Sequence, residues 1–110
     1  MTRVIAPLRP TRKHRYPLFS IADYAGWIRD DGLPFDPWLR LHVRAGARVL
    51  ALAPAAQTMT GTVKDWEAWV GTPLPATGEY VIPYGISVLN IDTAANAGTY
   101  IEPNIWVEHP

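Results

Sequence analysis

The stretch that decides the fold lies in the middle of the chain and reads FDPWLRLHVRAGA over residues 35–47. Asp36 can accept hydrogen bonds from the unpaired N–H groups of a first helical turn, and Pro37 suits the first helical position because no N–H is needed there. Gly46 can adopt the left-handed conformation that ends a helix. The pattern therefore predicts a helix of about two and a half turns that begins after Asp36 and ends at Gly46.

An apolar run, ARVLALA, follows this helix over residues 47–53 and stops at Pro54. A continuous apolar run of this length is typical of a strand that is buried on both faces. We expect residues 57–60 to continue as strand.

Two further helices are predicted from their caps. Ser20 is a favoured N-cap residue, and Gly32 is expected to end the helix that follows it. The apolar face of that helix would comprise Ile21, Tyr24, Ala25 and Ile28. Thr62 and Asp65 have capping-box spacing for a helix that ends at Gly71. The residues expected to face inward from this helix are Val63, Trp66 and Trp69.

The remaining apolar segments predict short strands. Residues 3–8 form the first, and Pro7 suits an edge strand or a bulge. Two others are expected at residues 79–82 and 86–91, and residues 99–101 with 104–108 are expected to make a final extended stretch around Pro103. This order of elements indicates an α+β fold with a mostly antiparallel sheet and two to three short helices. We expect one domain over residues 1–110, in which residues 1–16 form the first strand and a basic arm.

The composition limits the chemistry of the chain. The 110 residues include no Cys, which excludes disulfides, Cys-based zinc sites and cysteine nucleophiles. Absence of Cys is compatible with the cytoplasm, where we expect the chain to act. No apolar run approaches the ~20 residues of a membrane span, and the N-terminus lacks the apolar core of a secretory signal. The three His residues are too scattered to predict a metal site.

The positive charge is concentrated before the first acidic residue, Asp23, although the formal net charge is zero. The basic residues concerned are Arg3, Arg9, Arg12, Lys13 and Arg15. Such a cluster could bind a phosphate or a nucleic acid. We expect a solvated basic arm instead, because Pro7 and Pro10 break any helix that would present the charges together, and nucleic acid is the weakest of the predicted partners.

Several strings together resemble the C-terminal half of GNAT-superfamily acyl-CoA N-acyltransferases of the actinobacterial type. They are VIAPLRP (residues 4–10), DGLPFDPWLR (31–40), LHVRAGA (41–47), TGTV (60–63), GEYVIP (78–83) and EPNIWV (102–107). The resemblance implies acyl transfer from acetyl-CoA, or another acyl-CoA, to a small-molecule amine. Residues 3–8 would correspond to the fifth strand of the family, and the helix after Asp36 to its fourth helix.

The pyrophosphate loop of the family, Gln/Arg-x-x-Gly-x-Gly/Ala, does not occur at any glycine of this chain. In the family, backbone N–H groups at a helix N-terminus hold the cofactor phosphates. The resemblance therefore implies the acceptor-side portion of an N-acyltransferase that is inactive or incomplete as an isolated chain.

Two residues are candidates for this chemistry. His42 stands four residues before Gly46, where the family often has the Tyr that protonates the departing thiolate, and an imidazolium can donate such a proton. The alternative is a structural hydrogen bond. By the resemblance Asp36 would contact the pantetheine portion of the cofactor, although its role as a helix cap explains this residue fully and is the one we favour.

A second hypothesis is a small, non-catalytic binding or assembly domain. Loss of a neighbouring strand would leave residues 3–8 as an open sheet edge, and such edges recruit further strands. The partner would be a second copy of the chain or another chain.

Overall fold

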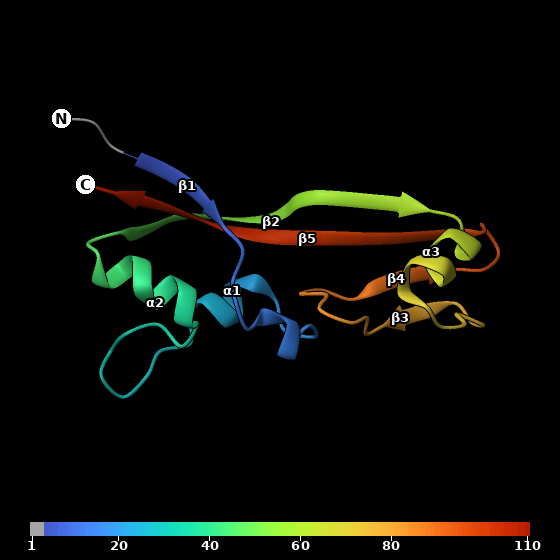
Figure 1. Cartoon of the computed structure of the whole chain (residues 1–110), viewed down its shortest axis with the longest axis horizontal. Helices are drawn as coiled ribbons and strands as arrows, with labels where there is room; N and C mark the ends of the chain where they lie inside the picture. Colours follow the sequence, from blue (N-terminus) through green and yellow to red (C-terminus); the bar gives the residue numbers. More distant parts are fainter. Residues whose placement is uncertain (1–3) are drawn as a thin grey trace.

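A five-stranded antiparallel sheet organises the computed structural model, which describes residues 4–110 (Figure 1). The strands are β1 (Val4–Leu8), β2 (Arg48–Gly61), β3 (Gly78–Tyr80), β4 (Leu89–Asp92) and β5 (Ala97–His109). The helices are the 3-10 helix η1 (Lys13–Arg15) and the α-helices α1 (Ile21–Ala25), α2 (Pro37–Arg44) and α3 (Val63–Val70). The predicted α+β class with a mostly antiparallel sheet is confirmed. Residues 1–3, with Arg3 of the predicted strand and basic arm, lie outside the described range.

Strand β5 is the axis of the sheet. It pairs with β2 along most of its length, from Gly61 opposite Gly98 to Arg48 opposite Glu108. Its C-terminal part also pairs with β1 and its N-terminal part with β4, which in turn pairs with β3. The long β2–β5 ribbon has α1 and α2 towards one end, and α3, β3 and β4 towards the other (Figure 1).

The caps read from the sequence form as expected in α2 and α3. Asp36 accepts hydrogen bonds at the start of α2, and Gly46 after its end has a φ of 96°. Thr62 and Asp65 form both hydrogen bonds of a capping box at α3, and Gly71 ends that helix in the left-handed conformation. These elements were predictable because each cap is made within a few residues of chain.

Helix α1 is shorter than predicted. Ser20 caps it as expected, but Gly26 already occupies the C-cap and the chain leaves the helix there. Ile28 instead makes an isolated bridge to Pro34 and is exposed. The backbone N–H of Arg29 donates to the carbonyl of Leu33, and Phe35 donates to Trp27. These hydrogen bonds close residues 27–35 into a hairpin-like loop, so Gly32 lies in a turn and does not end a helix.

The prediction that residues 47–53 are buried on both faces is wrong. Ala47 is buried, but no residue of β2 is buried, although the strand has 14 residues. Residues 57–60 do continue the strand, after a register irregularity between Ala53 and Gln57. The apolar run forms a strand because it pairs with β5, and among residues 4–110 it has no other strand partner.

Two separate hydrophobic clusters hold the ribbon. The first comprises Leu8, Ile21, Leu39, Ala47, Ile105 and Val107, and the second comprises Trp66, Leu74, Leu89, Ile91 and Tyr100. The residues of β5 that are buried change from even numbers, Gly98 and Tyr100, to odd numbers, Ile105 and Val107. Since side chains alternate along a strand, the two clusters pack on opposite faces of this twisted strand.

Other predicted details also need correction. Trp66 is buried as expected, but Trp69 on the same helix is 59% exposed and does not face inward. The strand predicted at 86–91 begins only at Leu89, whereas the extended stretch predicted around Pro103 does form, as the single strand β5. None of the helices within residues 4–110 has the length and hydrophobicity that a membrane crossing needs.

Candidate active site

The last turn of α2 brings His42 against the C-terminal end of β5. The His42 Nδ1 atom lies 2.8 Å from the His109 Nε2 atom, and both side chains are half-buried. His109 is opposite Val4 of β1 in the sheet register. The two histidines, 67 positions apart in the sequence, therefore form a pair beside the end of the first strand.

A hydrogen bond between two imidazole rings needs one nitrogen with a proton and one without. The pair can therefore share one proton between Nδ1 of His42 and Nε2 of His109. In the cationic form of His42, Nδ1 donates to His109, and Nε2 carries a second proton.

Trp38 supports the His42 ring from one helical turn earlier. The two ring centroids are 5.0 Å apart and the planes are almost perpendicular, at 85°. This edge contact, together with His109, restricts the imidazole on two sides. Trp38 itself is 44% exposed, so it does not belong to the hydrophobic core.

Asp36 is buried, and its two carboxylate oxygens are already occupied. Oδ2 accepts from the backbone N–H groups of Trp38 and Leu39, each at 3.0 Å. Oδ1 accepts from the backbone N–H of Arg12 at 3.2 Å and from the hydroxyl of Tyr24. The predicted helix cap is thus present, and it also fixes the chain after β1 and helix α1 to the start of α2. The predicted contact of Asp36 with a cofactor stays a prediction.

Two buried side chains near this network have shifted pKa values. Burial raises the pKa of Tyr24, and the hydrogen bond to Asp36 and the negative charge of that carboxylate raise it further. Burial lowers the pKa of Lys13, whose Nζ donates to the carbonyl oxygens of Tyr16 and Ile86. Lys13 is fully buried, so the expectation that it belongs to a solvated basic arm is wrong. Arg9 of the same cluster forms an ion pair with Glu102.

The α-helix N-termini are engaged by side chains of this chain. Ser20, Asp36 and Thr62 each accept from backbone N–H groups of the first turn that follows them. These are the donors that an anion would use at a helix N-terminus. In the described part of the chain there is also no group of three or more His, Cys, Asp or Glu residues that could hold a metal ion.

The role of His42 stays a prediction, and its partner His109 was not predicted from the sequence. The two are far apart in the sequence, and only the pairing of β5 with β1 and β2 brings the end of β5 beside α2. No local spacing signals such a pair. The capping of Asp36 was visible from the sequence, whereas its hydrogen bonds to Arg12 and Tyr24 were not.

A curated protein is similar in sequence to nearly the whole of this chain. The arginine N-acetyltransferase avaD of Aspergillus versicolor is 30% identical to this chain over an alignment of 125 residues. The alignment covers 97% of this chain and 43% of that enzyme, so the chain spans less than half the length of the curated relative. No family model and no solved structure gives a match. The similarity supports the acetyltransferase part of the predicted resemblance and leaves the actinobacterial type untested.

Proposed function

We propose that this chain is the acceptor-side portion of a GNAT-type N-acyltransferase, which transfers an acyl group from acetyl-CoA or another acyl-CoA to an amine. The observation that carries the proposal is the similarity of nearly the whole chain to less than half of an N-acetyltransferase. The helix N-termini, which are capped by side chains of this chain, are consistent with the proposal. The backbone N–H groups that bind the cofactor phosphates would then belong to the complementary portion of the enzyme.

In this reaction the amine nitrogen attacks the thioester carbonyl, a C–N bond forms and the C–S bond breaks. The amine loses one proton and the departing thiolate takes one up. His42 in its cationic form would give that proton from Nε2 while Nδ1 stays hydrogen-bonded to His109. His109 would keep the imidazole oriented, and Trp38 would limit its rotation. Asp36 would act by fixing the start of the helix that carries His42. A contact of Asp36 with the pantetheine portion of the cofactor also belongs to the proposal.

Calorimetry with acetyl-CoA tests the claim of an incomplete cofactor site. We expect no binding by this chain alone at micromolar concentrations. Micromolar affinity would show that the described residues do hold the cofactor phosphates, and it would contradict the acceptor-side assignment.

Substitution of the histidine tests the proposed acid. In a preparation that combines this chain with the complementary portion and transfers acetyl groups to an amine, His42→Phe should lower thiol release by about 10²-fold, which is typical for loss of a general acid. Arg44→Gln on the same helix is the matched control, since Arg44 is exposed and lies outside the histidine pair. Equal rates for His42→Phe and the control would exclude the role of His42.

The assembly function remains a second candidate, because the outer edge of β2 has no strand partner within residues 4–110. The open edge predicted at the first strand is of the same kind, since β1 pairs only with β5 among the strands of the described residues. A second copy of the chain could add to either edge.

A further inference from the structure

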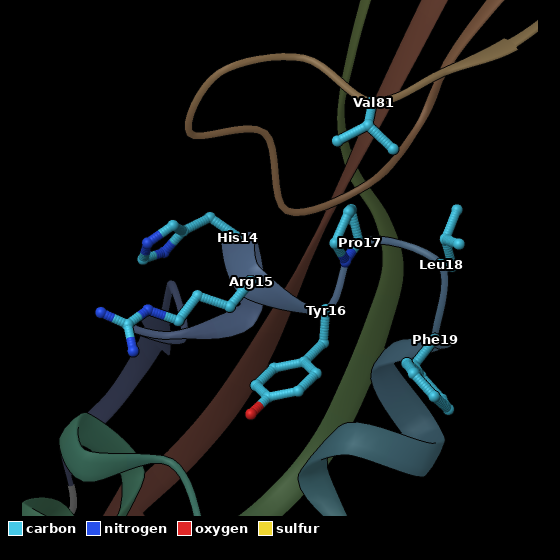
Figure 2. Close-up of a pocket in the computed structure, with 7 residues that line it drawn as sticks. All are labelled: His14, Arg15, Tyr16, Pro17, Leu18, Phe19 and Val81. Carbon is cyan, nitrogen blue, oxygen red and sulfur yellow. The ribbon is translucent and has the colours of Figure 1, made fainter.

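A pocket away from the histidine pair has two chemically different ends. Its volume is about 300 Å³, and it lies between the loop after η1 and the segment after β3 (Figure 2). The lining residues are His14, Arg15, Tyr16, Pro17, Leu18, Phe19 and Val81. No acidic residue is among them.

Within the described residues 4–110, the positively charged side chain at one end of the pocket has no partner. His14 and Arg15 extend to the same side of η1 (Figure 2). Within residues 4–110 the guanidinium of Arg15 makes no hydrogen bond and no ion pair. The His14 Nδ1 atom lies 3.0 Å from the carbonyl oxygen of Thr11, and this contact orients the ring and does not use Nε2. An anionic group is the complement of this end.

The opposite end is apolar and exposed. Leu18 and Phe19 lie beyond Pro17, on the side away from His14 and Arg15 (Figure 2). Val81, from the segment after β3, also lines the pocket. Leu18 is 73% exposed, Phe19 49% and Val81 63%. Apolar side chains gathered at a concave site are typical of small-molecule binding.

Ring contacts and hydrogen bonds fix Tyr16 and the two segments that line the pocket. The Tyr16 ring lies in edge contact with Trp27, at a centroid distance of 5.1 Å, and with Phe35, at 5.7 Å. The Nζ atom of the buried Lys13 donates to the backbone carbonyl oxygens of Tyr16, which lines the pocket, and of Ile86, which lies in the same segment after β3 as the lining residue Val81. A site that is fixed before binding loses less conformational entropy when a ligand enters.

We propose that this pocket binds a small molecule with a carboxylate and an aromatic or apolar body, of the class of N-acyl amino acids. The carboxylate pairs with Arg15 at the charged end, and the body lies on Tyr16 and Phe19. A free amino acid shares this chemistry but brings an ammonium group, for which the lining offers no carboxylate. We therefore expect the N-acylated form to bind more tightly. The proposal does not depend on the acyltransferase assignment, because binding here requires no acyl-CoA.

The test is a titration of the whole chain, followed by NMR, with four probes. They are N-acetylphenylalanine, phenylalanine, phenethylamine and arginine. We expect N-acetylphenylalanine to shift the signals of the pocket residues and of Trp27, phenylalanine to bind more weakly, and phenethylamine and arginine to cause no such shifts. Equal binding of phenethylamine, or shifts confined to other parts of the chain, would overturn the proposal.

Two variants separate the ends of the pocket. Arg15→Gln should weaken N-acetylphenylalanine binding by about tenfold, as loss of a charge-assisted hydrogen bond does. Phe19→Ala should weaken it to a comparable degree and leave the rejection of phenethylamine unchanged. Lys64→Gln is the control for loss of one exposed positive charge outside the pocket. An unchanged affinity in Arg15→Gln would remove the basis of the proposal.

Discussion

Asp36 shows how a single residue can be readable from the sequence in one role and hidden in another. The sequence predicts its cap on α2, because the donors lie two and three residues ahead. Its hydrogen bond from the Tyr24 hydroxyl joins two helices, and nothing in the local pattern predicts it. A buried carboxylate without these donors would be strongly destabilising.

Removal of the Tyr24 hydroxyl should therefore cost stability. Tyr24→Phe leaves Asp36 with one donor fewer, and we expect the free energy of unfolding at pH 7 to fall by about 2 kcal/mol. Urea unfolding followed by tryptophan fluorescence measures this change. Tyr84→Phe is the matched control, because Tyr84 is 79% exposed. Equal stability of the two variants would show that the hydroxyl contributes nothing.

The difference in stability between the wild-type chain and Tyr24→Phe depends on pH. Burial raises the pKa of Tyr24 in the folded chain, so its contribution is complete below the ordinary value of about 10 and is lost as the pH rises above it. The lowered pKa of Lys13 gives the opposite slope below that pH, and it is present in both proteins. We expect the stability difference between wild type and Tyr24→Phe to shrink above pH ~10. A difference that stays constant to pH ~11 would contradict the raised pKa.

At the scale of elements, the helices with caps were predictable and the exposure of the strands was not. The caps of α2 and α3 depend on contacts within one turn, whereas the length of α1 is decided by the loop of residues 27–35 that closes after Gly26. The apolar composition of β2 predicts burial, but its burial depends on what packs on it, and β5 is its only strand partner in the described part of the chain. The histidine pair is likewise a product of strand register.

The contact of α3 with β5 tests how closely these elements pack. A Cβ atom at Gly98 would lie 2.3 Å from Cδ1 of Trp66, whose Nε1 donates to the Gly98 carbonyl at 2.9 Å. We expect Gly98→Ala to lower the free energy of unfolding by about 1–3 kcal/mol, because the indole must move. Thermal unfolding by circular dichroism measures it. Gly26→Ala is the control, since its Cβ would make only ordinary contacts, and a similar small effect in both variants would contradict tight packing at Gly98.

At the scale of the whole molecule, the chain is elongated, with extents of 51 × 32 × 19 Å, and its two hydrophobic clusters lie along one ribbon. This shape leaves β2 with little cover over its 14 residues. Residues 49–60 of that strand carry no charge, and charged side chains are a common protection of edge strands. The molecule therefore presents a long, uncharged edge together with the shorter edge at β1.

We expect this edge to cause self-association that increases with concentration. Met59 of β2 is 47% exposed and Ile5 of β1 is 52% exposed. A lysine at an edge strand opposes the addition of a second strand, so Met59→Lys should shift the chain towards monomer in sedimentation velocity if β2 is the contact, and Ile5→Lys should do so if β1 is. We predict the larger effect for Met59→Lys, because β2 offers more unpaired backbone groups than the five residues of β1. Tyr84→Lys, at an exposed residue outside both strands, controls for the added charge. A wild-type chain that stays monomeric at every concentration would show that neither edge recruits a second copy.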